Sequence, residues 1–548
     1  MLLYGDNDVA MLEAMKNRGY KIRNVFDIGA STSAWSRTIR PVFPEARLDM
    51  FEPLAEHNAE YTQGLERCLR DDAMVHLHPV AVGAEDGEIE MTVFPDATGS
   101  TTLDVAAYDD GRRALRVAMR SVDSVIAAGE APVPDLLKVD IQGGELAVLR
   151  GARNTLPQVK FLLLETWLTR GYGANTPLLV ELMDFLRPFR FVPYEFGDVF
   201  RDANDYAAAI DVLFINAAFG LQPHHYFSGV KDTALVGAAG RARRWLRDVR
   251  GRVQPAAAPS AQADWAPAMA TDGERPPDAG TDADAAALAS CYESDRAVLR
   301  SILGRNYPID VVFDVGASNS SWSSQMAAEL PDARFELFEP LANQRPDYRK
   351  MLDWHTNTHE HSTLHPLAIG DRNAEIVLQM TKDAVGSTTL PVHHEVIESR
   401  PVRVPMRTID SMVTSGEVPR PDLLKLDIQG GELAALEGAE RTLPDVTLLV
   451  MESWLVRGYG IHTPLFDDLA RLCRRHGFLP FEFGDAHRDP TGLVTAVDVW
   501  FLNVRKSLAG AWYYTGVVET DDERSDHGIG WRWRDRLMRR FQRTAVGC

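Results

Sequence analysis

The stretch that decides the fold is Pro134-Asp-Leu-Leu-Lys-Val-Asp-Ile-Gln-Gly-Gly-Glu-Leu-Ala-Val-Leu-Arg-Gly-Ala152. The apolar run 136–139 predicts a short buried strand, the glycine pair that follows predicts a turn, and a helix is expected from Glu145. In an open α/β sheet, ligands bind at the carboxyl ends of the strands. Asp140, which ends this strand, is therefore expected where chemistry is done.

The same stretch recurs 287 residues later as Pro421-Asp-Leu-Leu-Lys-Leu-Asp-Ile-Gln-Gly-Gly-Glu-Leu-Ala-Ala-Leu-Glu-Gly-Ala439, with 16 of 19 positions identical. Further pairs keep this spacing: 25–31 with 312–318, 51–54 with 338–341, 99–103 with 386–390, 170–173 with 457–460, and 196–198 with 483–485. A register held over so many segments indicates a tandem duplication in which both copies share one fold.

Around this stretch, strands and helices are expected to alternate. The predicted strands of the first copy are 23–28, 48–51, 75–82, 88–94, 115–119, 136–139, 161–164, 191–196 and 212–216. One helix is expected to begin at about Ser33, whose hydroxyl could cap its first turn. Further helices are expected over 54–69, 121–128 and 178–186, besides the one that begins at Glu145. Such alternation predicts an α/β fold with a mostly parallel, doubly wound sheet in each copy. Segments 88–94 and 115–119 alternate polar and apolar residues and are expected to pair antiparallel.

The repeat divides the chain into four parts. We expect a first domain over 1–235, a basic segment and a disordered linker rich in Ala, Pro and Asp over 236–287, a second domain over 288–517, and a basic amphipathic tail over 518–548. The basic, aromatic-bearing segments 241–247 and 531–541 favour either weak contact with an anionic membrane surface or an acidic partner, or packing on their own acidic domain.

Composition excludes several classes of protein. A formal net charge of −20 argues against nucleic-acid binding, which needs a basic surface. The four cysteines lie at unmatched positions in the two copies, which suggests neither a disulfide framework nor a zinc site. No signal peptide and no apolar run of the length of a membrane span is visible, so a cytoplasmic protein without a transmembrane segment is expected.

Residues 27–31, Asp-Ile-Gly-Ala-Ser, follow the first predicted strand, and Glu52 ends the second. A glycine turn lets a ligand approach the backbone, and an acid at the next strand accepts ribose hydroxyls. The Gly-x-Gly-x-x-Gly pattern of a dinucleotide site is absent, and an acid before the glycine suits an ammonium group, so S-adenosylmethionine fits better than NAD. The alternative is a helix cap and a solvated strand end. The predicted cofactor-binding residues are Asp27, Gly29, Ser31 and Glu52, with Asp314, Gly316, Ser318 and Glu339 in the second copy.

The stretch Leu-Lys-(Val/Leu)-Asp-Ile-Gln-Gly-Gly-Glu-Leu, with segments 25–30, 80–83 and 117–123, resembles the signature of the FkbM family of S-adenosylmethionine-dependent methyltransferases. The resemblance covers about 20–217 and 307–504. It implies two class I methyltransferase domains with a Rossmann-like sheet, S-adenosylmethionine as methyl donor, and as acceptor a hydroxyl of a sugar, glycan or polyketide. One departure stands out: Ser33 and Ser320 occupy a position where the family commonly has a second glycine, and their side chains are expected near the methionine end of the cofactor.

Methyl transfer requires the acceptor oxygen in line with the sulfonium methyl, and a base adds about 10²- to 10⁴-fold. Asp140 and Asp427 are the first candidates for this base, and Glu165 and Glu452, which end the next strand, are the second. The alternative is that Asp140 bonds to the cofactor or to the Gly-Gly turn. Neighbouring carboxylates can also hold a divalent metal, although no dedicated ligand set is visible.

Three functions are compatible with these patterns. The first is a didomain O-methyltransferase acting on hydroxyls of a sugar, glycan or related small molecule, with different acceptors permitted by the divergent segments 106–112 and 392–398. The second has one catalytic half and one half that binds acceptor or partner without turnover. The third is a nucleotide-binding or NAD(P)-dependent Rossmann protein, against which the missing glycine fingerprint counts.

Overall fold

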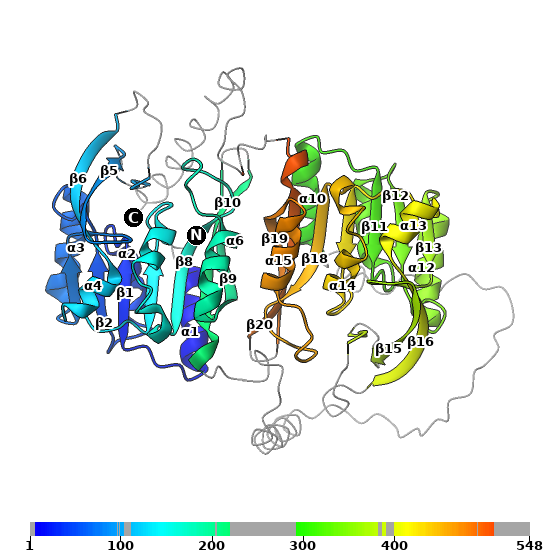
Figure 1. The fold of residues 1–548 in the computed structure, drawn as a ribbon, viewed down its shortest axis with the longest axis horizontal. Coiled ribbons are helices and arrows are strands. Elements are labelled where there is room, and N and C mark those ends of the chain that lie inside the picture. Colours follow the sequence, from blue (N-terminus) through cyan, green and yellow to red (C-terminus); the bar gives the residue numbers. More distant parts are fainter. Residues whose placement is uncertain are drawn as a thin grey trace, which may run out of the picture.

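The chain folds into two α/β halves that lie side by side (Figure 1). The computed structural model describes residues 6–95, 97, 99–103, 111–202, 205–219, 292–381, 386–390, 399–489, 492–508 and 514. The expected linker, the two basic segments and nearly all of the divergent segments 106–112 and 392–398 lie outside these residues.

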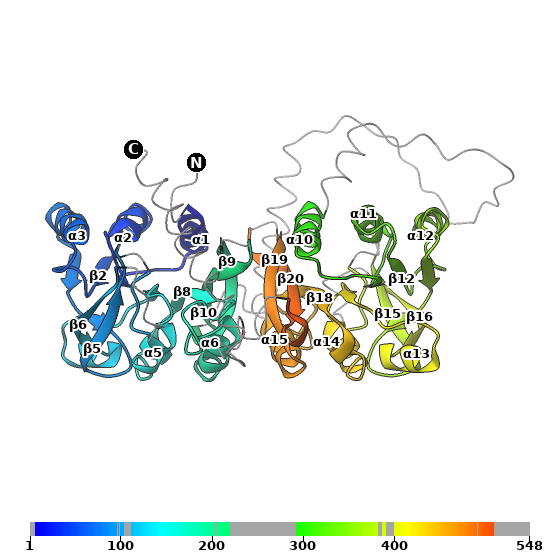
Figure 2. The same ribbon diagram turned by 90° about the horizontal axis from the view of Figure 1, so that it is seen from above.

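The first half is built on a seven-stranded sheet with helices on both faces. The strands of this half, seven in the main sheet and three in a smaller one, are β1 (Asn24–Ile28), β2 (Arg47–Phe51), β3 (Val75–His78), β4 (Ala81–Val82), β5 (Gly87–Val93), β6 (Arg113–Arg120), β7 (Leu136–Val139), β8 (Phe161–Trp167), β9 (Phe191–Arg201) and β10 (Ala207–Asn216). Its helices are α1 (Asp6–Asn17), α2 (Ala34–Ile39), α3 (Ala59–Asp71), α4 (Val122–Ala127), α5 (Glu145–Arg150) and α6 (Leu179–Leu186), with short 3-10 turns η1 (Leu156–Gln158), η2 (Arg187–Phe189) and η3 (Ala217–Phe219). Figure 2 shows α1, α2 and α3 on one face of the sheet and α5 and α6 on the other.

The second half repeats this order. Its strands are β11 (Val311–Val315), β12 (Arg334–Phe338), β13 (Ser362–His365), β14 (Ala368–Ile369), β15 (Ala374–Thr381), β16 (Ser399–Arg407), β17 (Leu423–Leu426), β18 (Leu448–Trp454), β19 (Phe478–Arg488) and β20 (Val494–Asn503). Its helices are α10 (Glu293–Gly304), α11 (Ser321–Glu329), α12 (Pro346–Thr358), α13 (Ile409–Ser415), α14 (Glu432–Glu437) and α15 (Phe466–Arg475), with the 3-10 turns η4 (Leu443–Asp445) and η5 (Val504–Lys506).

The strand order of the main sheet is β3-β2-β1-β7-β8-β10-β9 in the first half and β13-β12-β11-β17-β18-β20-β19 in the second. In both halves the first five of these strands run parallel, and β10 and β20 run antiparallel to β8 and β18. The order reverses at β1 and β7, so the crevice where a ligand binds is expected between their carboxyl ends. The predicted mostly parallel, doubly wound sheet is confirmed in both copies.

Beside each main sheet lies a three-stranded one, β4-β6-β5 or β14-β16-β15. The antiparallel pairing expected for 88–94 and 115–119 is confirmed, since β5 and β6 pair antiparallel. The single strand expected over 75–82 is wrong. It divides into β3 of the main sheet and β4 of the small one, and Pro79, which has no N–H to donate to a ladder, lies at the break.

Two helix starts also differ from expectation. The helix expected from residue 54 begins at Ala59, because the Asn58 side chain accepts from the backbone N–H groups of Glu60 and Tyr61 and so fixes the cap there. Ser33 precedes α2 in a left-handed conformation, with φ 62°, and its side chain makes no cap hydrogen bond. Its hydroxyl donates instead to the carbonyl oxygens of residues 32 and 64.

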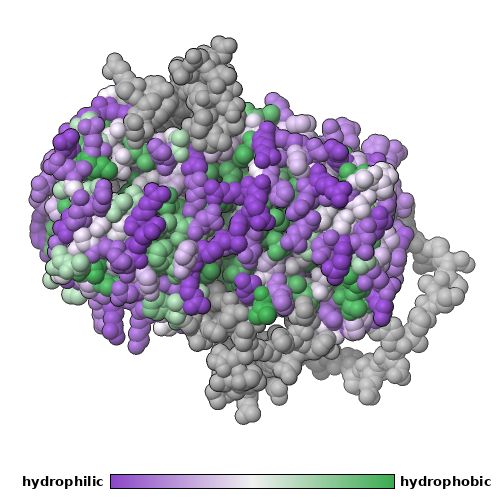
Figure 3. Space-filling view, viewed as in Figure 1, coloured by the Kyte–Doolittle hydropathy of each residue, from purple (hydrophilic) through white to green (hydrophobic). Residues whose placement is uncertain are grey.

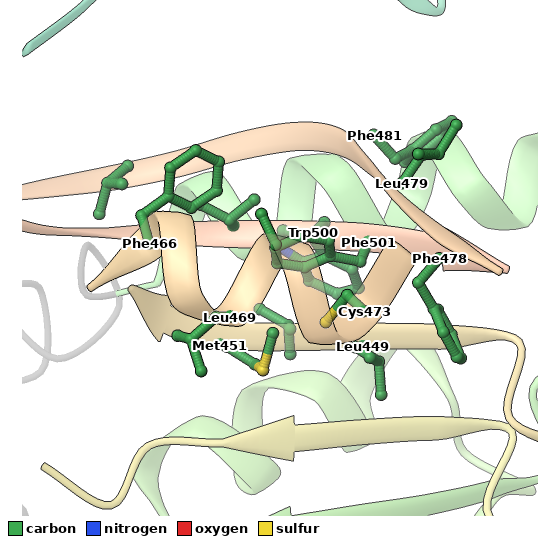
Figure 4. Close-up of a cluster of buried hydrophobic side chains, with 14 of the residues drawn as sticks. Leu449, Met451, Phe466, Leu469, Cys473, Phe478, Leu479, Phe481, Trp500 and Phe501 are labelled. Atoms are coloured by element: carbon green, nitrogen blue, oxygen red, sulfur yellow. The ribbon is translucent and has the colours of Figure 1, made fainter. Parts of the chain in front are cut away.

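The core of each half lies between its sheet and its helices. Phe26, Phe51 and Leu137 on the central strands are buried, as are their counterparts in the second half. Figure 4 shows the core beneath α15, where Leu469 and Cys473 of the helix lie close to side chains of β18 and β20. Strands buried on both faces explain the near-continuous apolar runs of the sequence.

The halves meet along their edge strands β9 and β19 and along α6 and α15, which lie side by side in both views (Figures 1 and 2). Phe196 of β9 contacts Phe466 and Phe483 of the second half, with ring centroids 5.5 and 4.8 Å away. The face in Figure 3 is mostly hydrophilic, with its apolar residues in separate small patches. Within the described part of the chain, no helix has the length and apolar character needed to cross a bilayer.

Candidate active site at the carboxyl edge of the sheet

A cavity of about 150 Å³ lies at the carboxyl ends of β1, β2 and β7 in the first half. Gly29, Ser31 and Glu52 line it on one side, and Asp140 and Gln142 on the other. Its wall also includes Phe51, Leu54, Tyr61, Val80, Val82, Met91 and Ile141, which make it largely apolar. A concave, mostly apolar site with a few convergent polar groups is typical of a cofactor pocket.

Glu52 ends β2 and is held from two directions. One carboxylate oxygen accepts the backbone N–H of Ser31 and the other accepts that of Leu54, both at 2.8 Å. Burial raises the pKa of Glu52 to about 7, although these two hydrogen bonds oppose the shift. The carboxylate is therefore fixed in orientation at the cavity wall and titrates near neutral pH.

The turn after β1 depends on a glycine. Gly29 has φ 84°, and a Cβ built on it would lie 2.0 Å from the carbonyl oxygen of Asp140. In the structure this glycine lines the cavity and also makes room for the end of the neighbouring strand. Ser33, placed in the sequence near the cofactor, is fully buried and absent from the cavity wall. Its left-handed backbone is a conformation that glycine adopts without strain.

Asp27 does not reach the cavity. It is fully buried, its Oδ2 accepts the hydroxyl of Ser36 at 2.7 Å, and its Oδ1 lies 3.2 Å from the ammonium of Lys138. Lys138 also lies 3.3 Å from Asp140 and 5.5 Å from the centre of the Trp35 ring. Burial alone would lower the pKa of Lys138, but the carboxylates of Asp27 and Asp140 outweigh it and raise the pKa above its ordinary value.

Asp140 and Glu165, the two candidate bases, are joined by one amide. The Gln142 side chain donates to Asp140 at 3.1 Å and to Glu165 at 2.9 Å. Its own carbonyl accepts the hydroxyl of Tyr172 at 2.7 Å, and its backbone carbonyl accepts that of Thr101 at 2.7 Å. Burial raises the pKa of Glu165 well above its usual range, with the nearby Asp140 as a further cause.

Glu145 fixes the Gly-Gly turn. The carboxylate is fully buried, and one oxygen accepts the N–H groups of Ile141 at 3.3 Å and Gly143 at 3.0 Å. Burial raises the pKa of Glu145 to about 7. The residue thus supports the loop that carries Gln142, whose backbone is itself left-handed with φ 60°.

A second cavity, of about 30 Å³, lies on the other side of Asp140. Its walls come from β7, β8, β9, β10, α1 and α2, and it is lined by Asp8, Trp35, Lys138, Val139, Asp140, Leu163, Glu165, Asp198, Phe200 and Asp211. Asp140 borders both cavities.

The second half builds the same network from the matched residues. Lys425 lies 3.1 Å from Asp314 and 3.4 Å from Asp427. Gln429 donates to Asp427 at 3.0 Å and to Glu452 at 2.8 Å, and accepts the hydroxyl of Tyr459 at 2.6 Å. Glu339 accepts the N–H groups of Ser318 and Leu341, and Gly316, with φ 84°, approaches the carbonyl of Asp427 as closely as its counterpart does.

One difference between the halves, near the candidate bases, is a histidine. In the second half His487 of β19 lies 3.4 Å from the carboxylate of Asp498, and this contact raises the pKa of the imidazole. The matched residues of the first half are Phe200 and Asp211, which line the small cavity. The walls around the two candidate bases are therefore chemically different.

Sequence reasoning missed several parts of this network. Gln142 lies within the stretch 134–152 and Tyr172 within the repeated segment 170–173, but the sequence patterns indicated no role for either. Asp8 of α1, a helix that was not predicted, accepts the Trp35 indole N–H at 2.9 Å. Gln142, Tyr172 and Asp8 each recur 287 residues later, and this recurrence could have identified them as parts of the site. Among the described residues, no group of three or more His, Cys, Asp or Glu side chains is arranged to hold a metal ion.

The chain is similar in sequence to known methyltransferases. A model of the methyltransferase FkbM domain matches residues 24–200 and 314–480, one match in each half. The hexuronic acid methyltransferase AglP of Haloferax volcanii is 44% identical over 45 residues, which are 8% of this chain and 19% of that protein. Methyltransferase 1 of Beauveria bassiana is 23% identical over 146 residues, or 23% of this chain and 57% of that protein. The chain thus spans less than two thirds of the length of either relative.

Among solved structures, an FkbM methyltransferase from Methylobacillus flagellatus is similar, with 20% identity, a TM-score of 0.24, and coverage of 35% of this chain and 43% of that one. The magnesium protoporphyrin IX methyltransferase of Synechocystis, solved with bound S-adenosylmethionine, is 11% identical with a TM-score of 0.23, and covers 42% of this chain and 86% of that one. These scores are too low to carry an argument, so the family assignment rests on the two matches to the family model.

Proposed function

The chain belongs to the FkbM methyltransferase family and is an S-adenosylmethionine-dependent methyltransferase of class I fold; on that premise we propose that both halves are active and methylate hydroxyl groups of a sugar or glycan. The observation that carries this proposal is the position of Asp140, which borders the larger, apolar cavity and the smaller, acidic one. Methyl transfer needs the acceptor oxygen in line with the sulfonium methyl at near-attack distance, and a carboxylate that borders both cavities could serve as the base beside that oxygen.

The larger cavity fits the cofactor. Glu52 offers a fixed carboxylate of the kind that accepts ribose hydroxyls, and the apolar side chains around it suit an adenine ring. When bound, S-adenosylmethionine supplies an electrophilic methyl group on a sulfonium. We assign Gly29, Ser31 and Glu52 to this pocket, with Gly316, Ser318 and Glu339 in the second half. Asp27 and Asp314 act through the lysines that they pair with, and not by contact with the cofactor.

On the acceptor side, Asp140 would hold the acceptor hydroxyl and take its proton, while bound S-adenosylmethionine would give up its methyl group to that oxygen, with cleavage of its carbon–sulfur bond, and leave as S-adenosylhomocysteine. The contacts with Lys138 and Gln142 fix the orientation of this carboxylate. Glu165 is the second candidate; it shares the Gln142 amide with Asp140, and burial raises the pKa of its carboxyl group. By position, Asp427 is the base of the second half, and Glu452 corresponds to Glu165.

The acceptor is a hydroxyl-rich and uncharged molecule in this proposal. The small cavity of the first half is bordered by Asp8, Glu165, Asp198 and Asp211 besides Asp140, and by Lys138 as its cation. Carboxyl groups accept hydrogen bonds from hydroxyls when ionised and donate one when protonated, and the ionised ones repel an anionic acceptor. A neutral sugar therefore fits the first half better than the hexuronic acid named for the Haloferax relative. His487 makes the second half the better candidate for an anionic sugar.

The test is a titration followed by a transfer assay. S-adenosylhomocysteine is titrated calorimetrically into the intact protein, Glu52→Ala and Glu339→Ala, with Glu56→Gln, a change at an exposed residue near the first pocket, as control. Two sites in the intact protein, with one lost in each pocket variant, support two working pockets. Transfer of labelled methyl from S-adenosylmethionine is then measured with methyl glucoside and with glucuronic acid. One site that disappears with a single variant would instead favour one catalytic and one binding half, and binding of NAD(P) alone would reject the proposal.

A further inference from the structure

The two halves contact each other in a reciprocal way. Arg201 of β9 places its two terminal nitrogens 2.6 and 2.5 Å from the two carboxylate oxygens of Glu482 on β19. The matched residues exchange roles, since Arg488 of β19 lies 2.6 Å from Glu195 of β9. A contact in which equivalent residues exchange partners is the mark of a two-fold interface. The halves therefore pair as the subunits of a symmetric dimer do, but within one chain.

This symmetry fixes the directions of the two active sites. Because the late residue of each strand meets the early residue of the other, β9 and β19 run antiparallel. Each of these edge strands runs in the same direction as the central strands of its own sheet, since two antiparallel pairings separate it from β8 or β18. The carboxyl edges therefore face opposite ends of the molecule, and in Figure 1 the small sheets β5-β6 and β15-β16 lie at opposite ends accordingly.

The Arg201–Glu482 pair lies next to the small cavity of the first half. Asp198 and Phe200 of β9 line the small cavity, and Arg201 is the following residue. Its countercharge, Glu482, is 1% exposed and belongs to the other half. Arg305, also of the second half, donates to the backbone carbonyl of residue 205 and lies 3.8 Å from the centre of the Tyr206 ring. The end of β9 and the start of β10 in the first half are thus held by residues of the second.

We propose that each half positions the acceptor wall of the other: Glu482 acts on the first site through Arg201, and Glu195 acts on the second through Arg488. This inference rests on the proposed methyl transfer, and it makes the two glutamates positioning residues. Neither touches its own half's acceptor wall, because each lies in the early part of its edge strand. Since the sites face opposite ends, an acceptor methylated at one site is released before it reaches the other.

The test compares the effect of each glutamate variant on turnover in its own half and in the other half. In a Glu339→Ala background only the first half turns over, and there Glu482→Gln is expected to lower kcat/KM for methyl glucoside by about 10- to 100-fold, mainly through KM. Affinity for S-adenosylhomocysteine in the first half stays within about twofold, because the cofactor cavity lies beyond Asp140. In a Glu52→Ala background the same variant leaves turnover by the second half nearly unchanged. Glu195→Gln is expected to show the opposite pattern, with glucuronic acid as a second probe.

Two further variants separate positioning from general damage to the fold. Glu417→Gln removes a carboxylate from the exposed contact 3.4 Å from Arg407 in the second half and is expected to change neither half. The exchange Arg201→Glu with Glu482→Arg restores the pair with reversed charges and is expected to recover most of the lost kcat/KM. Loss of turnover in the second half on Glu482→Gln, or equal loss in both halves, would overturn the proposal.

A measurement without an acceptor keeps this inference distinct from the proposed function. If S-adenosylhomocysteine binds in both halves but neither sugar is methylated, the proposed acceptor class is wrong. Hydrogen exchange then tests whether each half positions the acceptor wall of the other. In Glu482→Gln the amides of 196–202 and 207–211 are then expected to exchange at least about fivefold faster, with 494–498 unchanged. Unchanged exchange at 196–211 would contradict the proposal.

Discussion

Glu52 is expected to make cofactor binding depend on pH between 6 and 8. Burial raises the pKa of its carboxyl group to about 7, so the group is largely protonated at pH 6 and largely ionised at pH 8. The ribose hydroxyls of the cofactor are hydrogen-bond donors and favour the ionised carboxylate. Binding therefore releases a proton, and affinity rises as pH rises through about 7 and is constant above it.

The magnitude follows from the ionised fraction. With a pKa of about 7, this fraction is roughly one tenth at pH 6 and roughly nine tenths at pH 8. If only the ionised form binds well, affinity for S-adenosylhomocysteine rises by about tenfold, or about 1.4 kcal/mol, over this range. The matched Glu339 also has a pKa raised to about 7 by burial, so both halves should respond alike.

The assay is calorimetric titration at pH 6, 7 and 8 in buffers of different ionisation enthalpy, which reports both affinity and proton release. A Glu339→Ala background isolates the first half. Glu52→Gln removes the titrating group and is expected to bind weakly and without pH dependence, whereas Glu56→Gln should behave as the parent does. The reasoning is refuted if affinity is the same at pH 6 and 8, or if the pH dependence persists in Glu52→Gln.

Other predictions concern the buried network and the fold. Lys138→Met leaves the fully buried Asp27 carboxylate without its cation and is expected to lower the free energy of unfolding of the first half by about 3–5 kcal/mol, measured by urea denaturation. Gly29→Ala drives a Cβ into the Asp140 carbonyl oxygen and should cost at least about 2 kcal/mol in the same measurement. Tyr172→Phe removes one hydrogen bond from the amide that orients Asp140 and is expected to cost about 1 kcal/mol of stability and to reduce kcat more than cofactor affinity. Burial raises the pKa of the Glu145 carboxyl group from 4.5 to about 7, so the folded protein binds this proton more tightly than the unfolded chain does. The stabilisation from this proton is fully present below pH 4.5 and is lost as pH rises through about 7. The free energy of unfolding should therefore fall over this window, and should fall less in Glu145→Gln.

The sheet could be predicted from the sequence because its strands are buried on both faces. The runs 136–139 and 161–164 are apolar at every position but Lys138, and the repeat showed each strand twice. The helix start at Ala59 and the break at Pro79 could not be placed in the same way. Both depend on local hydrogen bonds, which a periodicity of apolar residues does not record. In one case the Asn58 side chain accepts them from backbone N–H groups, and in the other they join β4 to the small sheet.

The candidate site residues at strand ends could be predicted from the order of the elements, but their buried partners could not. Strand ends point to Asp140, Glu52 and Glu165, because the carboxyl edge of the sheet follows from topology. The partner of a buried charge does not follow from topology. Asp27 ends deep in the sheet opposite Lys138, and that pairing across adjacent strands became visible only with the register of β1 against β7.

The duplication also gives a physical reason for the difference between the two acceptor walls. The reciprocal pairs Arg201–Glu482 and Arg488–Glu195 require both copies to keep the same charges at the interface, since a change in either copy leaves a buried partner unpaired. Phe200 and His487 lie one residue before these arginines and are outside that constraint. In the two-fold arrangement the walls can therefore diverge while the interface that positions them cannot, and acceptor specificity is expected to differ between the halves at this position first.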